Sequence, residues 1–452
     1  MKTKKIINTL NYNQKGGKKL IKLAENFILK PNKNQQIILG CLGYASARLY
    51  NVGNYERKNY SKNSNKDFPD WYKQKKKLKK HFWYKNLPSQ TAQETLKILS
   101  DNWKSYFKSI KDYKSNSNKY TGKPKPPSYK AKGNKFNFRY LNNGFKILNN
   151  KLRLSIPKQL KDYLKEKYSI NQKFLWIKVP KELLSNDRDY ILNNTTRLEF
   201  KPLSNDHYKL ILIYKVNTPK IKPDNGNYLS IDLGLNNLAT CYSNKTKESF
   251  ILDGGQYLSI SRYFNKKIKH FQSILNSQDK QISKRLKQLY QKRDRQIRHL
   301  IHTATKKIVN YCIAHNINRV IVGDIKGIRE DKNIGKVSNQ KLHQFPYEEI
   351  YHQLEYKLKL KGINLIKKNE SYTSQCSPYT KKVTKKYAEG SKRKKRGLYV
   401  DDKKAFNADA VGAFNILRKY LHQRRKGPDI DLKVEGLNNL TKYSWNKDIF
   451  VA

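Results

Sequence analysis

The chain has 452 residues, which allows about three domains, and its 96 Lys and Arg outnumber its 35 Asp and Glu to give a net charge of +61. No run approaches the roughly 18 consecutive apolar residues of a membrane span. The basic start Met1–Lys5 is followed by a segment too short and too polar for the apolar core of a signal peptide. The four cysteines, at 41, 241, 312 and 376, lack the spacing of a disulfide framework. We therefore expect a cytoplasmic protein with no membrane contact.

The positive charge predicts a polyanionic partner. An excess of this size on one folded body opposes folding by self-repulsion unless a polyanion neutralises it. Basic runs occur throughout the chain, as at Lys73–His81 and Ser391–Arg396. A Lys- and Asn-rich genome composition would explain part of the Lys excess, but not the lack of matching Asp and Glu. Nucleic acid with a long footprint is the predicted partner, and in a prokaryote the protein would be nucleoid-associated.

The first part of the chain, to about residue 118, reads as mostly helical. After Pro88, with Ser89 as a candidate N-cap, apolar residues recur at helical spacing and predict one buried stripe. The residues of this stripe are Ala92, Leu96, Leu99, Trp103, Phe107 and Ile110. Aromatic residues also alternate with lysines at 68–73 and 81–85. They could stack on bases, or they could pack in the core of a small helical domain.

The second part, to about residue 222, has the period of strands. Residues 111–135 are rich in Lys, Ser, Asn and Pro and predict a loop or extended chain. Beyond them, short alternating or apolar segments are separated by turn clusters such as Asn142–Gly144. The segments are 136–140, 151–156, 174–179, 196–200 and 208–214. They predict a small antiparallel sheet or barrel.

The third part, from Pro223, reads as a ribonuclease-H-like α/β core. Its predicted strands are 228–232, 239–242, 249–252, 319–322 and 363–366, and its predicted helices are 257–315, 346–361 and 408–421. Asp232 ends the first strand and Asp409 opens the last helix. Carboxylates from distant segments can converge on divalent metal, which activates water and stabilises the departing oxygen of a phosphodiester. Each aspartate has a structural alternative, as a turn residue or as a helix cap.

Two segments carry a resemblance to a known family. Ser230-Ile-Asp-Leu-Gly-Leu-Asn-Asn-Leu-Ala239 and Asn407-Ala-Asp-Ala-Val-Gly-Ala-Phe-Asn-Ile416 resemble the first and third motifs of the RuvC nuclease domain in TnpB proteins. These are transposon-encoded RNA-guided DNA nucleases related to compact type V CRISPR effectors. The stretches 87–92 and 124–130 also resemble the N-terminal pattern of the family.

The resemblance covers essentially the whole chain and implies a multidomain α+β fold. It implies a wedge-like β-barrel formed by residues 1–33 and 119–222, with a helical recognition domain inserted at 34–118. A RuvC nuclease domain would follow at 223–452, with an insert at about 376–404.

The second RuvC motif departs from the common pattern. Most members carry Glu after the fourth strand, where this chain has Gly323 followed by Asp324. Side chains alternate along a strand, so Asp324 is expected to point away from the site. Glu370, just beyond the next strand, resembles the relocated acid of a branch whose second-motif residue is Gly. The expected metal ligands and catalytic residues are therefore Asp232, Glu370 and Asp409, with Asp324 and then Glu330 as weaker candidates.

The expected cofactor is Mg²⁺, with Mn²⁺ as the alternative ion, because carboxylate oxygens suit hard cations. Family members often carry two Cys pairs before the third motif, whereas this chain has Cys376 and then neither Cys nor His through Lys404. One soft ligand does not build a tetrahedral zinc site, so zinc is not expected. The basic segment Arg393–Leu398 is a candidate nucleic-acid contact or a solvated loop.

The predicted function is RNA-guided DNA cleavage, with guide RNA and target double-stranded DNA as partners. A short duplex motif would be read by the protein, and guide–target pairing would supply sequence specificity. The alternative is a guide-directed DNA-binding repressor with a decayed nuclease, suggested by Gly323. A plain RNA-binding or transposition accessory protein is weaker, because it leaves the two RuvC motifs unexplained. The sequence does not predict the oligomeric state.

Overall fold

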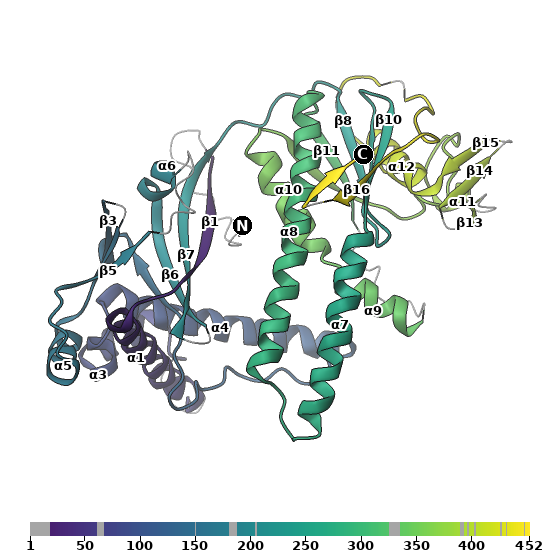
Figure 1. Cartoon of the computed structure of the whole chain (residues 1–452). Coiled ribbons are helices and arrows are strands. Elements are labelled where there is room, and N and C mark those ends of the chain that lie inside the picture. The colour runs from purple at the N-terminus through teal and green to yellow at the C-terminus, as the bar shows by residue number, and fades with distance from the viewer. Residues whose placement is uncertain are drawn as a thin grey trace. The chain divides into compact units, whose positions relative to one another are not determined.

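The computed structural model describes residues 19–60, 67–149, 151–179, 188–203, 206–324, 335–388, 393–395, 397–401, 404–424, 427–430, 432–446 and 448–452 (Figure 1). The chain divides into two compact units, whose main spans are Ile21–Val216 and Asn217–Ala452. Both combine helices and strands, so the fold is a multidomain α+β fold, as predicted. Within the described residues, we find no helix with the length and apolar character needed to cross a membrane.

In the described part of the first unit, four α-helices lie before residue 118, where the sequence predicts mostly helical structure, and two short ones lie where it predicts strands. They are α1 (Lys33–Lys58), α2 (Trp71–Lys77), α3 (Phe82–Lys85) and α4 (Ser89–Ser115), with the short α5 (Lys158–Tyr168) and α6 (Arg188–Asn193) between strands. Asn32 caps α1 in a reciprocal capping box with Gln35. In α4, Pro88 occupies the N-cap position and Ser89 is the first helical residue, so the helix begins one residue earlier than predicted. The residues of the predicted α4 stripe from Ala92 to Trp103 are buried, and α4 packs against α1.

The aromatic residues between these helices divide between core and surface. Phe68 packs on Trp103 and Phe107, with ring centroids 5.5 and 5.4 Å apart, and Tyr84 is buried. Tyr72 and Phe82, in contrast, are 57% and 58% exposed. Phe68, Trp103 and Tyr84 therefore pack in the core of the helical part. The exposed side chains of Tyr72 and Phe82 are available to contact a partner.

The strands of the first unit form two sheets instead of the expected closed barrel. The larger sheet has the order β1 (Lys19–Leu29), β7 (Tyr208–Thr218), β6 (Thr195–Pro202), β2 (Phe138–Leu141), and the smaller has β3 (Phe145–Leu148), β4 (Lys151–Ser155), β5 (Phe174–Lys178). A 3₁₀ turn at Asn142–Gly144 takes the chain from β2 into the second sheet. Because β2 and β3 belong to different sheets, the described strands do not close into a ring.

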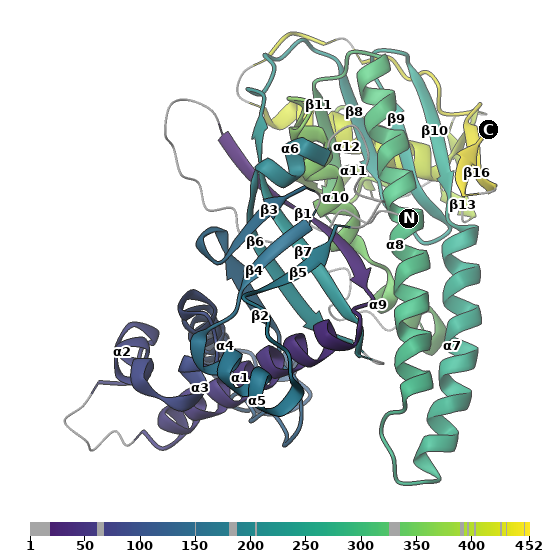
Figure 2. The same cartoon turned by 60° about the vertical axis from the view of Figure 1, so that its left-hand side comes forward.

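The second unit is built on one mixed sheet, which Figure 2 shows face-on beside α8. Its order is β12 (Asn364–Asn369), β11 (Arg319–Asp324), β8 (Tyr228–Asp232), β9 (Asn237–Ser243), β10 (Glu248–Asp253), β16 (Thr441–Asn446), β17 (Ile449–Val451). The accompanying helices are α7 (Gly255–Asn276), α8 (Lys284–Ala314), α9 (Lys336–Gln344), α10 (Tyr347–Lys359), α11 (Lys385–Ala388) and α12 (Ala408–Gln423). The long predicted helical stretch is thus two helices, α7 and α8. The insert adds the small sheet β13 (Arg393–Lys395), β14 (Leu398–Asp401), β15 (Lys404–Asn407).

Strand alternation assigns the two faces of this sheet to different helices. Leu229 and Ile231 of β8, with Val320 and Val322 of β11, pack in one core with α8 and α10. Tyr228 of β8 and Ile321 of β11 pack in a second core with α12. Odd and even positions of each strand therefore face opposite helical layers.

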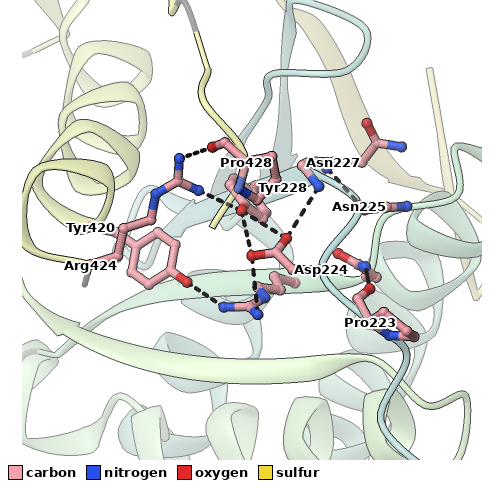
Figure 3. Close-up of polar contacts among 11 residues, drawn as sticks. Pro223, Asp224, Asn225, Asn227, Tyr228, Tyr420, Arg424 and Pro428 are labelled. Atoms are coloured by element: carbon pink, nitrogen blue, oxygen red, sulfur yellow. Dashed lines mark hydrogen bonds and ion pairs between the residues drawn. The ribbon is translucent and has the colours of Figure 1, made fainter. Parts of the chain in front are cut away.

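A polar network anchors the amino-terminal end of β8 to the end of α12 (Figure 3). The Tyr228 hydroxyl donates to the Asp224 carboxylate at 2.8 Å and accepts from Arg424 at 2.7 Å. Arg319 of β11 forms an ion pair with Asp224 at 3.0 Å and donates to the Tyr420 hydroxyl at 2.8 Å. Burial is the main cause of the raised pKa of Tyr228. The network holds β8, β11 and α12 together at the end of the sheet away from Asp232.

Candidate active site

Three strands of the second unit end beside one another, and the predicted acids lie at these ends. Asp232 is the last residue of β8, and Glu370 directly follows β12. In the parallel pairing of β11 with both neighbours, Val322 lies opposite Ile231, and Asp324 lies opposite Asn369. The carboxyl ends of β8, β11 and β12 therefore open on the same edge of the sheet.

Gly323 and Asp324 face opposite layers. An added Cβ on Gly323 would lie 3.1 Å from the Ile416 Cδ1 atom of α12. Asp324 instead acts on α10, where the pKa of Tyr351 is raised to about 12, first by burial and then by nearby carboxylates that include Asp324. The alternation of β11 thus directs Asp324 away from the α12 face, as the sequence predicts.

Glu370 fills the space that a side chain at position 323 would occupy. A Cβ built on Gly323 would overlap the Oε2 atom of Glu370 and lie 3.5 Å from its Cβ. The carboxylate of Glu370 therefore lies over the α-carbon of Gly323, and it reaches this place from the neighbouring strand. A larger residue at position 323 would force the carboxylate of Glu370 to move away from this place.

Asp232 and Asp409 border the same helix. A Cβ added to Gly412 of α12 would lie 2.6 Å from Asp232 Oδ2, so Gly412 leaves room for this carboxylate. Asp409 lies in the first turn of α12, whose N-cap Asn407 accepts from the backbone N–H groups of residues 409 and 410. The Asn237 side chain, at the start of β9, donates to Asp409 Oδ2 at 2.7 Å. The first and third motifs are thus joined by a direct hydrogen bond.

Two lysines flank Glu370. Lys368 lies on β12, two residues before Glu370, and Lys419 projects from α12. Burial lowers the pKa of Lys419, the charge of Lys368 lowers it further, and Glu370 acts in the opposite direction. Burial also lowers the pKa of Lys368. These amines place positive charge next to the carboxylates.

The structure places Asp232 against Gly412 of α12, Glu370 over Gly323 beside Ile416, and Asp409 in the first turn of α12. All three are partly exposed. Across the part of the chain that is described, no group of three or more His, Cys, Asp or Glu residues is clustered closely enough to hold a metal ion. The donor set itself, three carboxylates, fits a hard cation such as Mg²⁺.

Two other predicted positions have different outcomes. Glu330 lies outside the described residues. Cys376 is buried, and its thiol donates to the carbonyl oxygen of Thr384 at 3.4 Å. Burial raises the pKa of this thiol.

Sequence reasoning singled out neither Asn237 nor Asn415, although both lie inside the quoted motifs. Asn237 contacts Asp409, and Asn415 donates to two backbone carbonyls of the loop after Glu370. A single asparagine at the start of a strand or within a helix carries no periodic signal of its own. Its presence in a motif that also contains an acid was the available signal.

Two family models match the second unit and the strand before it. Residues 212–329 match a family described as "Probable transposase" (OrfB, the TnpB transposase), and residues 347–416 match "Cas12f1-like, TNB domain". The resemblance to TnpB is confirmed. The region that matches the transposase family contains Asp232, and the Cas12f1-like region contains Glu370 and Asp409. A comparison with curated proteins finds no match.

Solved structures of compact RNA-guided effectors also resemble the chain. A Cas12f1–sgRNA–target DNA complex is 18% identical, with a TM-score of 0.49 over 86% of this chain and 83% of that one. The mini-RNA-guided endonuclease CRISPR-Cas_phi3 is 12% identical, with a TM-score of 0.41 over 91% and 93% of the respective chains. A CRISPR-Cas12f ternary complex is 18% identical, with a TM-score of 0.32 over 84% and 80%.

Proposed function

We propose that this chain is an RNA-guided DNA endonuclease whose RuvC-type site lies in residues 223–452. The observation that carries the proposal is the placement of three motif acids, Asp232, Glu370 and Asp409, against one face of α12. Two further features support it: the two regions that match family models together contain all three acids, and the net charge is +61. Guide RNA and target double-stranded DNA are the proposed partners, with action in the cytoplasm or on the nucleoid.

The acids would hold Mg²⁺, or Mn²⁺ in its place, through carboxylate oxygens. When bound, such ions would supply Lewis-acid polarisation of the phosphodiester and activation of water. Gly323 and Gly412 leave space for two of the carboxylates, and Asn237 orients the third. Lys368 and Lys419 would attract the phosphate backbone to the edge where these acids lie.

The first unit would bind nucleic acid without cutting it. We assign residues 1–33 and 119–222 as a wedge-like part and 34–118 as a helical recognition part. The exposed Tyr72 and Phe82 beside clustered lysines suit stacking on bases, and the lysines suit phosphates. Base pairing between guide and target would supply sequence specificity.

A second function is a guide-directed DNA-binding repressor with a decayed nuclease. The observation that favours it is that the described residues contain no group of three ligating side chains close enough for a metal ion. The two candidates share RNA and DNA binding and differ only in cleavage.

The test begins with sequencing of the RNA that co-purifies with the protein. That RNA is then reprogrammed against a plasmid carrying a matching target next to a randomised flank. We expect a defined RNA species, guide-dependent binding and linearised plasmid in Mg²⁺. Binding without cutting in either Mg²⁺ or Mn²⁺ would establish the repressor, and the absence of any bound RNA would refute both.

A further inference from the structure

Side chains of α12 hold the loop that follows Glu370. The Asn415 side chain is fully buried, and its Nδ2 atom donates to the carbonyl oxygens of Thr373 and Cys376, each at 2.8 Å. Its Oδ1 atom accepts from Arg418 at 2.7 Å, and the same guanidinium group donates to the Ser377 carbonyl at 3.0 Å. One amide therefore ties two turns of the loop to the helix.

The residues on either side of Glu370 are tied to α12 as well. The Lys419 amine donates to the Asn369 side chain and to the Ser371 carbonyl, both at 3.0 Å. Lys419 and Asn415 lie one helical turn apart on α12. Lys419 therefore contacts the residues on either side of Glu370, and Asn415 contacts the loop after it.

A short chain of hydrogen bonds leads from Asn415 to Glu370 itself. The carbonyl oxygen of Glu370 accepts from the backbone N–H of Thr373 at 3.1 Å and from its hydroxyl at 2.7 Å. The carbonyl of Thr373 in turn accepts from Asn415. A shift of Asn415 is thus transmitted to the backbone of Glu370 through a single residue.

The position of Glu370 explains why such anchoring is needed. An acid at position 323 would stand on β11, within a ladder that pairs Gly323 with Lys368 of β12 and Val322 with Ile231 of β8. Glu370 lies one residue beyond the end of β12, outside the ladder, yet its carboxylate has to stay over Gly323. Misplacement of a reacting group by about 1 Å can cost a hundredfold in rate.

We propose that Asn415 and Lys419 are positioning residues that hold Glu370 over Gly323, so that the relocated acid depends on α12. This inference rests on the proposed function for its catalytic consequence, while the anchoring itself is independent of it. Asn415 touches no reacting atom and acts through the loop.

The test uses the full-length protein with its RNA and the variants Asn415→Asp, Lys419→Met and Lys419→Arg. Asn415→Asp keeps the volume and replaces the amide donor with an acceptor that faces two carbonyls. Lys247→Met is the matched control, because this lysine is 53% exposed and pairs with Glu435 away from the loop. Three measurements are made: amide hydrogen exchange of the peptide spanning 369–377, Mn²⁺ affinity by electron paramagnetic resonance, and the Mg²⁺ dependence of plasmid cleavage.

We expect faster exchange confined to the 369–377 peptide in Asn415→Asp and Lys419→Met. Mn²⁺ affinity and cleavage should fall about 10-fold to 100-fold in both variants, and target binding should be unchanged in Asn415→Asp. Lys419→Arg should retain most of both, and Lys247→Met should match the unmodified protein. If Asn415→Asp fails to fold, Lys419→Met decides the matter.

Unchanged exchange and unchanged Mn²⁺ affinity in a folded variant would overturn the inference. A failure of the proposed function has a different signature, because the unmodified complex would then not cut. The exchange measurement would still show whether α12 holds the loop.

Discussion

At the scale of single residues, two glycines define where the acids lie. Gly323 and Gly412 have no side chain, and the space above each α-carbon is taken by a carboxylate, of Glu370 and Asp232 respectively. Neither position is one that the backbone conformation reserves for glycine, since neither has a positive φ. Their role is therefore one of close approach, which is a reason for glycine independent of turn geometry.

Gly323→Ala should displace Glu370 and lower the rate of cleavage about 100-fold, because the new methyl group overlaps Oε2 of that residue. Folding should survive, since a flexible side chain can rotate away. Cleavage of target plasmid, with circular dichroism as a folding check, measures the effect. Gly122→Ala is the control, as its added Cβ would meet nothing within 4 Å. Normal cleavage by Gly323→Ala would show that Glu370 does not act from this position.

At the scale of elements, α12 is the centre of the candidate site. It contributes Asp409, leaves room for Asp232 at Gly412, packs Ile416 above Gly323 and ties down the loop after β12. Its far end is held by the network around Asp224 and Tyr228. Because the same helix connects all three acids, displacement of α12 would affect them together.

Asp224→Asn should lower the stability of the protein by about 1–3 kcal/mol, because it leaves Arg319 without its charge partner and weakens the bond to Tyr228. Thermal unfolding of the purified protein measures this loss. Asp67→Asn serves as the comparison, since its ion pair with Lys73 is solvent-exposed and should add little. Equal melting temperatures for the two variants would argue against an anchoring role for the network.

The sequence predicted the elements of the second unit well and those of the first unit less completely. The strands β8, β11 and β12 were recognisable because each is a short apolar run between turn residues. The barrel was predicted wrongly, because alternation identifies strands but does not say which strands pair. Among the described strands, the turn at Asn142–Gly144 separates β2 from β3, which belong to different sheets. The strands β16 and β17 were missed because β16 is mostly polar and exposed and β17 is only three residues long.

For the candidate site, alternation along β11 was enough to separate Asp324 from Gly323. It could not show that the Glu370 carboxylate lies over Gly323, since this depends on the register of β11 and β12 and on the turn after β12. Alternation also could not predict the contacts of Asn237 and Asn415, because these contacts join segments that are distant in sequence.

At the scale of the whole molecule, the net charge of +61 makes nucleic-acid affinity depend on salt. If about ten phosphates are neutralised, the slope of log affinity against log salt should be near −9 for duplex and about −7 for single strands. Fluorescence anisotropy across a salt series measures it for both substrates. A slope shallower than about −3 would mean that most lysines contact no phosphate.

The most direct test of the whole account compares four single variants of the purified ribonucleoprotein in Mg²⁺. Asp232→Ala, Glu370→Ala and Asp409→Ala should each nearly abolish cleavage of a supercoiled target plasmid while guide-directed binding in chelator persists. A triple variant should be hardly worse than any one of them, because groups that act as a unit are not additive. Asp324→Ala should keep most of the activity, since its side chain faces α10. The contradicting result is normal cleavage by Glu370→Ala together with loss of cleavage in Asp324→Ala.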